Sequence, residues 1–251
     1  KANIAMASTS QIRAQVEARL ADRIPSAFAQ RSSVEMLTMP TGVSTVDAAI
    51  GGIPCGGITE IVGPSWYSVG RKSLQAQLLA HAARERFCAL IDANDSFDPR
   101  SAKTAGVNLE RVLWIRGGGH GVKALEQAFK ASDLLLQGSA GFGLIMVDLA
   151  GISERLVRKV PLTTWFRFRS VAEKFDSPLV FITPCPVLGT CSSLTLTLSA
   201  AEVRWSLPTP GSPAHARLPA GLDFHLEVAT RRAFKKPSQP IRTFSAQRRW
   251  A

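Results

Sequence analysis

The segment GGIPCGGITEIVGPSWYSVGRKSL, residues 51–74, predicts a strand, a glycine-containing loop and the start of a helix. In a phosphate-binding loop of this layout, backbone N–H groups and the helix N-terminus hold the phosphates, a Lys reaches the terminal ones, and a Ser or Thr binds magnesium. The strict pattern G-x-x-x-x-G-K-[ST] is absent, because Gly63 stands seven residues before Gly70 and Arg71 follows Gly70. The segment therefore indicates an altered phosphate-binding loop.

The chain around this segment alternates short apolar runs with amphipathic stretches. The runs are rich in branched residues and lie at 58–62, 87–91, 111–115, 144–149 and 179–183. Helices are expected at 72–86 and 120–138. This alternation is typical of an α/β fold, a doubly wound and mostly parallel central sheet flanked by helices, with its functional loops at the carboxyl ends of the strands. Beyond Cys191, strand-like pieces follow at 194–199, 202–207 and 222–229.

The sequence divides into three expected parts: an N-terminal helix and linker at 1–39, a core at 40–228, and a basic, flexible tail at 229–251. The first part contains a helix at 10–24, which Pro25 ends. One face of this helix carries an apolar stripe at Ile12, Val16, Leu20 and Ile24. A helix this short needs a surface to pack on. Its own domain and a neighbouring subunit or partner remain two open alternatives, so an oligomer is one expectation.

The charge of the chain is concentrated in the tail. Thirty Lys and Arg against nineteen Asp and Glu leave a net charge of +11, which favours a polyanionic partner such as nucleic acid. Seven cations and no acid lie in the tail, at Arg231, Arg232, Lys235, Lys236, Arg242, Arg248 and Arg249. Phe234, Phe244 and Trp250 lie among them. Cations that neutralise phosphates beside rings that stack on bases predict binding of single-stranded DNA. The alternatives are a solubilising disordered tail or strands with solvated cations.

Membrane and metal functions are not indicated. No apolar run reaches the roughly 18 residues of a membrane span, and the N-terminus KANIAMASTS lacks the pattern of a secretion signal. The four cysteines, Cys55, Cys88, Cys185 and Cys191, show no metal-ligand spacing. The expected location is the cytoplasm, with no membrane partner and no metal.

Three segments in the same order resemble the RecA family. They are TGVSTVDAAIGGIPCGGITEIVGP at 41–64, FCALIDANDSFDPRSAKTAGVNLERVLW at 87–114, and GLIMVDLAG at 143–151, whose Asp148 matches the Walker B acid. The resemblance covers about residues 40–205 and implies a RecA-like P-loop core.

Further segments resemble the ImuA-type branch of RecA-like proteins, which works with a specialised DNA polymerase in damage-induced mutagenesis. They are VGRKSL at 69–74, DLLLQGSAGFGLIMVDL at 133–149 and PLTTWFRFRSVAEKFDSPLVFIT at 161–183. This resemblance implies three partners besides single-stranded DNA: a Y-family polymerase-like subunit, the replicative polymerase and RecA.

The matched nucleotide site departs from the RecA pattern. Arg71 stands at the lysine position, and Lys72 stands at the magnesium-binding hydroxyl, where an ammonium cannot bind the metal. A one-residue shift of the loop would instead bring Lys72 and Ser73 into the standard positions. Asn94 replaces the glutamate that activates water, and an amide cannot accept that proton. Pro184 replaces a polar amide that senses the terminal phosphate.

These departures favour a non-catalytic protein. We interpret Gly63, Gly70, Arg71, Lys72, Ser73, Asn94 and Asp148 as remnants of a nucleotide site, with no catalytic residue and no cofactor. The leading hypothesis is a RecA-like accessory protein of DNA repair that links DNA or RecA to an error-prone translesion polymerase. One alternative is a weak DNA-dependent ATPase that uses ATP and magnesium in the shifted loop. Another is a cell-division inhibitor that resembles SulA-type proteins.

A second candidate surface lies in TTWFRFRSVAEKF, residues 163–175. Aromatic residues and Arg dominate the contacts that stabilise protein interfaces. We therefore expect a partner-binding patch at Trp165, Phe166, Arg167 and Arg169, although packing of Trp165 and Phe168 in the core explains part of the pattern. In the loop at 65–70, Trp66 and Tyr67 are expected to fill the vacated nucleotide space.

Overall fold

A computed structural model describes residues 37–64, 70–138, 141–174, 176–206, 213, 219–231 and 244–247. The helix expected at 10–24, the Trp66 and Tyr67 loop and most of the basic tail lie outside these residues. The described residues belong to one compact unit that begins at Met36. No helix among them is long and apolar enough to cross a membrane.

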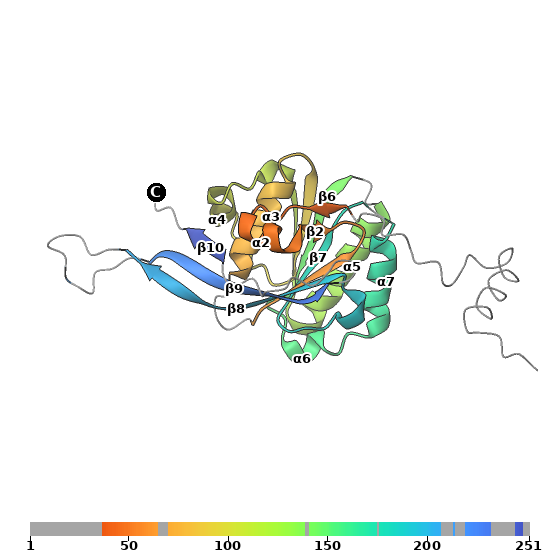
Figure 1. Ribbon diagram of the computed structural model, residues 1–251. Helices are drawn as coiled ribbons and strands as arrows, with labels where there is room; N and C mark the ends of the chain where they lie inside the picture. The colour runs from red at the N-terminus through yellow and green to blue at the C-terminus, as the bar shows by residue number, and fades with distance from the viewer. Residues whose placement is uncertain are drawn as a thin grey trace, which may run out of the picture. The chain divides into compact units, whose positions relative to one another are not determined.

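An eight-stranded sheet forms the centre of this unit, in the order β10-β9-β8-β3-β7-β6-β4-β5 (Figure 1). The strands are β3 (Ile58–Val62), β4 (Phe87–Asp92), β5 (Val112–Arg116), β6 (Phe142–Asp148), β7 (Leu179–Thr183), β8 (Leu194–Trp205), β9 (Pro219–Arg231) and β10 (Phe244–Gln247). The strands from β8 to β5 are parallel, and β9 and β10 add two antiparallel strands. The expected α/β class and the five expected parallel strands are confirmed.

Helices cover both faces of the sheet (Figure 1). One face is covered by α2 (Ser44–Ile50), α3 (Arg71–Ala82) and α4 (Pro99–Thr104), and the other by α5 (Gly121–Gly138), α6 (Glu154–Val157) and α7 (Leu162–Ala172). Each central strand therefore buries both sets of alternate side chains. In β6, Leu144 and Met146 pack under the first group of helices, and Ile145 and Val147 pack under the second. Such strands have continuous apolar sequences, which is why they were recognisable.

Short elements complete the unit. β1 (Thr38–Met39) pairs antiparallel with β2 (Ile53–Pro54) in a separate two-stranded sheet. The 3-10 helices η1 (Leu109–Arg111) and η2 (Gly189–Cys191) precede β5 and β8. Arg111, expected in a strand, is instead the last residue of η1.

The C-terminal part differs from its expected outline. The pieces expected at 194–199 and 202–207 are one strand, β8, whose register shifts between Ser199 and Glu202. The boundary expected at 228/229 falls inside β9, because the backbone pairing with β8 continues to Arg231. Phe244–Gln247 pair with β9 as β10.

Candidate functional site

Two buried carboxylates lie side by side at the carboxyl edge of the sheet. Asp92 ends β4 and Asp148 ends β6, and the two residues are partners in the parallel register. Their exposed fractions are 0% and 2%. Functional sites of doubly wound sheets lie at this edge.

The start of α3 is held close to β9. Gly70 precedes the helix with a φ of 79°, a left-handed conformation that glycine adopts most readily. A Cβ at Gly70 would lie 2.5 Å from the ring of Phe224, which is fully buried. This close approach places the first turn of α3, with Arg71 and Lys72, at the edge of the sheet.

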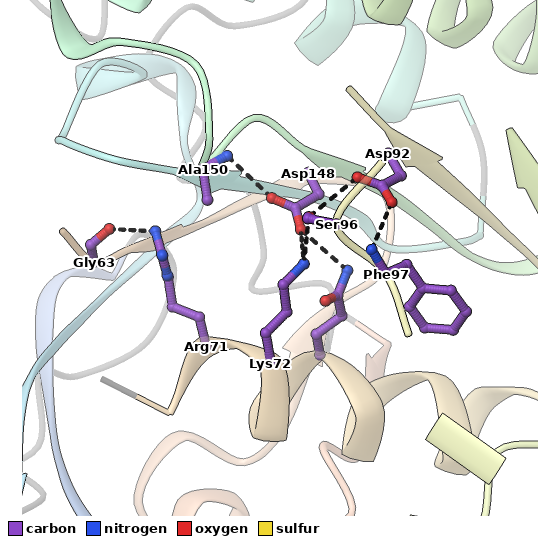
Figure 2. Close-up of polar contacts among 9 residues, drawn as sticks. Gly63, Arg71, Lys72, Asp92, Ser96, Phe97, Asp148 and Ala150 are labelled. Atoms are coloured by element: carbon purple, nitrogen blue, oxygen red, sulfur yellow. Dashed lines mark hydrogen bonds and ion pairs between the residues drawn. The ribbon is translucent and has the colours of Figure 1, made fainter. Parts of the chain in front are cut away.

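Lys72 joins the two strand ends (Figure 2). Its ammonium donates hydrogen bonds to Asp148 Oδ2 and to Ser96 Oγ, each at 2.7 Å. The Ser96 hydroxyl donates in turn to Asp92 Oδ1 at 3.2 Å. The Lys72 side chain is 50% exposed and that of Asp148 is 3% exposed, so the ion pair reaches from solvent into the core.

Backbone N–H groups and a side-chain amide donate further hydrogen bonds to both carboxylates. Asp148 Oδ1 accepts from the Ala150 N–H at 3.0 Å, and Asp148 Oδ2 also accepts from Gln75 Nε2 at 3.4 Å. Asp92 Oδ2 accepts from the Phe97 N–H at 2.7 Å. These donors stabilise the two carboxylates in the core, where an unpaired charge would be very costly.

Arg71 contacts the end of a different strand, β3. Its guanidinium donates to the Gly63 carbonyl at 2.6 Å, at the end of β3. Burial lowers the pKa of Arg71, and the Asp148 carboxylate partly offsets this effect. Ser73 follows on α3, whereas the contacts to Asp148 come from Lys72 and Gln75, which are three residues apart and share one helix face.

Asn94 and Asp95 have contacts of their own. Asn94 packs against Gly151, where an added Cβ would lie 2.6 Å from Asn94 Cγ, and its buried Oδ1 has no hydrogen-bond partner among the described residues. Asp95 has a φ of 53° and pairs with Arg116 at 2.6 Å. The structure therefore brings Lys72 and Asp148 together, and Asn94 packs against Gly151.

The model of the RecA N-terminal domain family matches residues 10–156. This chain belongs to the RecA N-terminal domain family. Over 122 residues it is 37% identical to the protein RecA of Rickettsia bellii (strain RML369-C), a match that covers 47% of this chain and 33% of that protein. Identity to the protein RecA of Rickettsia prowazekii (strain Madrid E) is 35%, with 47% and 34% covered. The chain thus spans about a third of the length of the curated relatives it matches.

The residues of this RecA-family site do not fit a magnesium ion. A P-loop site offers a Ser or Thr hydroxyl and a Walker B acid to the metal, which needs octahedral oxygen ligands. Here Lys72 brings a positive charge within 2.7 Å of the acid, Asp148. Among the described residues, no group of three or more His, Cys, Asp or Glu could hold a metal ion.

The expected partner patch on α7 needs one correction. Trp165 is only 1% exposed, because it packs against Phe129, Phe168 and Phe181 between the helices and the sheet. It therefore cannot belong to an exposed surface. Phe166 is 45% exposed.

The two arginines of the patch have partners within the fold. Arg167 pairs with Asp133 of α5 at 3.0 Å and lies over the Phe168 ring, 5.2 Å from its centroid. Arg169 pairs with Glu173 at 2.8 Å. Both residues are on α7, so the helix carries two anchored cations beside Phe166.

The expected DNA-binding residues fall mostly outside the described part of the chain. Arg231 is the last residue of β9. The others, Arg232, Lys235, Lys236, Arg242, Arg248 and Arg249, lie outside the described residues. Their role stays a prediction.

Sequence reasoning missed the role of Glu60. This residue lies in β3, is 1% exposed, and accepts hydrogen bonds from Thr183 Oγ1 at 3.1 Å and from the Val187 N–H at 2.8 Å. The Leu188 N–H also donates to it, at 3.3 Å. Burial raises the pKa of Glu60, and these hydrogen bonds limit the rise. A single Glu inside an apolar strand was the available signal.

Proposed function

We propose that this chain is a non-catalytic RecA-like accessory protein of DNA repair and damage-induced mutagenesis, related to the ImuA type. In this role it links single-stranded DNA or RecA to an error-prone translesion polymerase. The observation that carries the proposal is the ion pair between Lys72 and Asp148 inside a RecA-family core. It places an ammonium against the acid that a RecA-type ATPase needs for its metal.

The position of Asn94 supports a loss of hydrolysis. A general base must lie within hydrogen-bond reach of the attacking water and accept its proton. Asn94 has no proton-accepting group and is packed against Gly151. The nearby acid, Asp95, is held by Arg116 through two hydrogen bonds of 2.8 and 2.6 Å. Neither residue supplies the base that the family pattern requires.

The charge of residues 229–251 supports DNA as one partner. This segment carries seven cations and no acid. The curated relatives that match the chain are named RecA. Arg231, the first of these cations, is the last residue of β9 in the sheet. Binding that depends on these cations should weaken as salt concentration rises, because phosphate contacts release counterions.

The exposed face of α7 supports a protein partner. Leu162 and Phe166 are 57% and 45% exposed, and they lie four residues apart on one helix face. Arg169 follows three residues after Phe166 and is held in place by Glu173. Exposed apolar side chains beside an oriented arginine are typical of interface contacts. We assign this face to the Y-family polymerase-like subunit.

Fluorescence anisotropy with labelled oligo-dT tests the DNA partner. A variant with Arg232, Lys235, Lys236, Arg248 and Arg249 changed to Gln should bind oligo-dT more weakly at low salt. Its slope of log K against log salt should fall by about 0.7 for each lost phosphate contact. The matched control changes five exposed cations of the core, Arg100, Lys103, Lys123, Lys130 and Lys174, to Gln. An equal loss in both variants would contradict the assignment to the tail.

Capture of a purified Y-family polymerase subunit and of RecA filaments on single-stranded DNA tests the accessory role. The wild-type chain should capture at least one of them without ATP and should show no ATP turnover. ATP turnover that Lys72→Ala abolishes would instead establish the ATPase alternative. A chain that binds neither oligo-dT nor these proteins would refute the proposal.

A further inference from the structure

The position of Lys72 on α3 determines what it can contact. In the family pattern a Ser or Thr stands here, and its short hydroxyl and the Walker B acid hold a magnesium ion between them. The Lys72 side chain places its nitrogen several bonds further from the backbone. It reaches Asp148 Oδ2 directly at 2.7 Å, with no space for an ion between the two atoms. The Lys72 ammonium thus binds Asp148, the acid that would otherwise hold the metal.

The contacts of the ammonium also join separate parts of the sheet edge. Lys72 belongs to the first turn of α3, Asp148 ends β6, and Ser96 follows β4 (Figure 2). Through Ser96 the network continues to Asp92, the register partner of Asp148. A magnesium ion in a P-loop protein connects the loop to the Walker B strand in a similar way, but only while nucleotide is bound.

We propose that the Lys72 ammonium is a tethered replacement for the divalent cation, so that α3, β4 and β6 are joined permanently and without nucleotide. This inference concerns the internal state of the core and does not depend on the accessory role proposed above. A ligand shifts a conformational equilibrium only when it binds two states with different affinity. In this core, the cation that would be added or lost with nucleotide is part of the chain.

The charges at the site agree with a cation tethered at Lys72, with Arg71 as a second cation near Asp148. Asp92 and Asp148 are both buried, and Lys72 pairs directly with Asp148. Phe97 donates to Asp92 Oδ2 and Ala150 to Asp148 Oδ1, and Gln75 shares Asp148 Oδ2 with Lys72. These donors supply part of the stabilisation that a doubly charged ion would give. Removal of the ammonium leaves Asp148 buried without its ion-pair partner, which is the costly half of breaking such a pair.

The test removes the Lys72 ammonium so that a metal ion can bind beside Asp148. Lys72→Thr supplies a hydroxyl and empties the space beside Asp148, whereas Lys72→Met removes the charge and keeps that space filled. Thermal unfolding of the full chain is followed in EDTA, in MnCl2 and in MgCl2, without nucleotide. We expect the melting temperature of wild type to be the same in all three. Both variants should melt lower than wild type in EDTA.

The two variants should then differ in their response to metal. At a Mn2+ concentration 100 times the dissociation constant, Lys72→Thr should recover about 5–10 °C. Lys72→Met should recover less, and the double variant Lys72→Thr with Asp148→Asn should recover nothing. No recovery of Lys72→Thr, including failure to fold in saturating Mn2+, would overturn the proposal. Recovery of the double variant would also overturn it, because the metal would then bind elsewhere.

Wild-type protein alone supplies a second test. Mn2+ broadens NMR signals of nearby amides, and the Ala150 N–H lies 3.0 Å from Asp148 Oδ1. If Lys72 takes the place of the cation, the Ala150 signal should keep its width on addition of Mn2+. Selective broadening of this amide would show that a metal binds beside Lys72, and the proposal would be wrong.

Discussion

Phe224 of β9 lies directly against Gly70 at the start of α3, and its ring occupies the space where any larger residue would place a Cβ. The contact joins the antiparallel part of the sheet to the helix that carries Lys72. It explains why glycine stands at this position even though the phosphate-binding pattern around it has changed. Packing against Phe224 thus requires glycine at position 70.

Gly70→Ala should therefore destabilise the fold strongly. The variant meets two costs, a left-handed backbone at a φ of 79° and a clash 2.5 Å from the Phe224 ring. Together they should lower the free energy of unfolding by about 3–5 kcal/mol, measured by urea denaturation. Gly106→Ala is the matched control, because Gly106 has a φ of 94° and no atom within 4 Å of an added Cβ. Its cost should be about 1–2 kcal/mol; equal losses would contradict the role of Phe224.

Glu60 should give the stability of the fold a dependence on pH. Its folded pKa is raised, so the folded state holds its proton more tightly than the unfolded state. The contribution of Glu60 to stability is thus greatest below the unfolded pKa and is lost as pH rises through the folded pKa. Glu60→Gln keeps an oxygen acceptor for Thr183, Val187 and Leu188 and removes the titration. The stability of Glu60→Gln relative to wild type should rise between pH 4 and the folded pKa of Glu60.

Urea denaturation of both proteins across that pH range measures this difference. Glu60→Leu is the control for hydrogen bonding, since it leaves the Val187 and Leu188 N–H groups without their acceptor. Relative to Glu60→Gln it should lose about 2–4 kcal/mol at every pH, because neither variant titrates at this position. A stability difference between wild type and Glu60→Gln that does not change with pH would show that Glu60 does not titrate in this way.

The cysteines should differ in reactivity. Burial raises the pKa of the Cys88 thiol to about 12, and Cys185 and Cys191 are also buried. Cys55 is partly exposed, and burial raises its pKa as well. Because the thiolate is the reactive form, iodoacetamide at pH 8 should label Cys55 slowly and the other three only after unfolding. Mass spectrometry of the labelled chain, with Cys55→Ser as control, checks this order, and labelling of Cys88 in the folded protein would contradict it.

The sequence predicted the sheet better than the contacts at its edge. Strands such as β6 and β7 were recognisable, because burial on both faces requires apolar residues at every position. The ion pair was not, because Lys72 and Asp148 are 76 residues apart and meet only through the packing of α3 on the sheet. The sequence placed Lys72 at the metal-binding position but did not show that its side chain reaches Asp148.

Helix periodicity has a similar limit on α7. The sequence pattern favoured packing of Trp165 and Phe168 in the core, but it does not state which face of the helix meets the sheet. Phe129 and Phe181, which surround Trp165, come from α5 and β7. Which face of α7 meets the sheet therefore depends on aromatic residues far away in the chain. For this reason the expected patch included Trp165, which is buried.

Substitutions of two phenylalanines of α7, one buried and one exposed, should accordingly affect stability and partner binding differently. Phe168 is fully buried against Trp165, Phe129 and Phe181, so Phe168→Ala should lower the free energy of unfolding by about 3–5 kcal/mol. Phe166 is 45% exposed, so Phe166→Ala should change stability by only about 0.5 kcal/mol. If the exposed face of α7 binds the polymerase subunit, Phe166→Ala should nevertheless weaken capture about tenfold or more, as loss of a central interface residue does. Urea denaturation and a pull-down titration, carried out on the same preparations, measure the two effects. Unchanged capture by Phe166→Ala would exclude this face of α7, because the variant remains folded and lacks only the exposed ring.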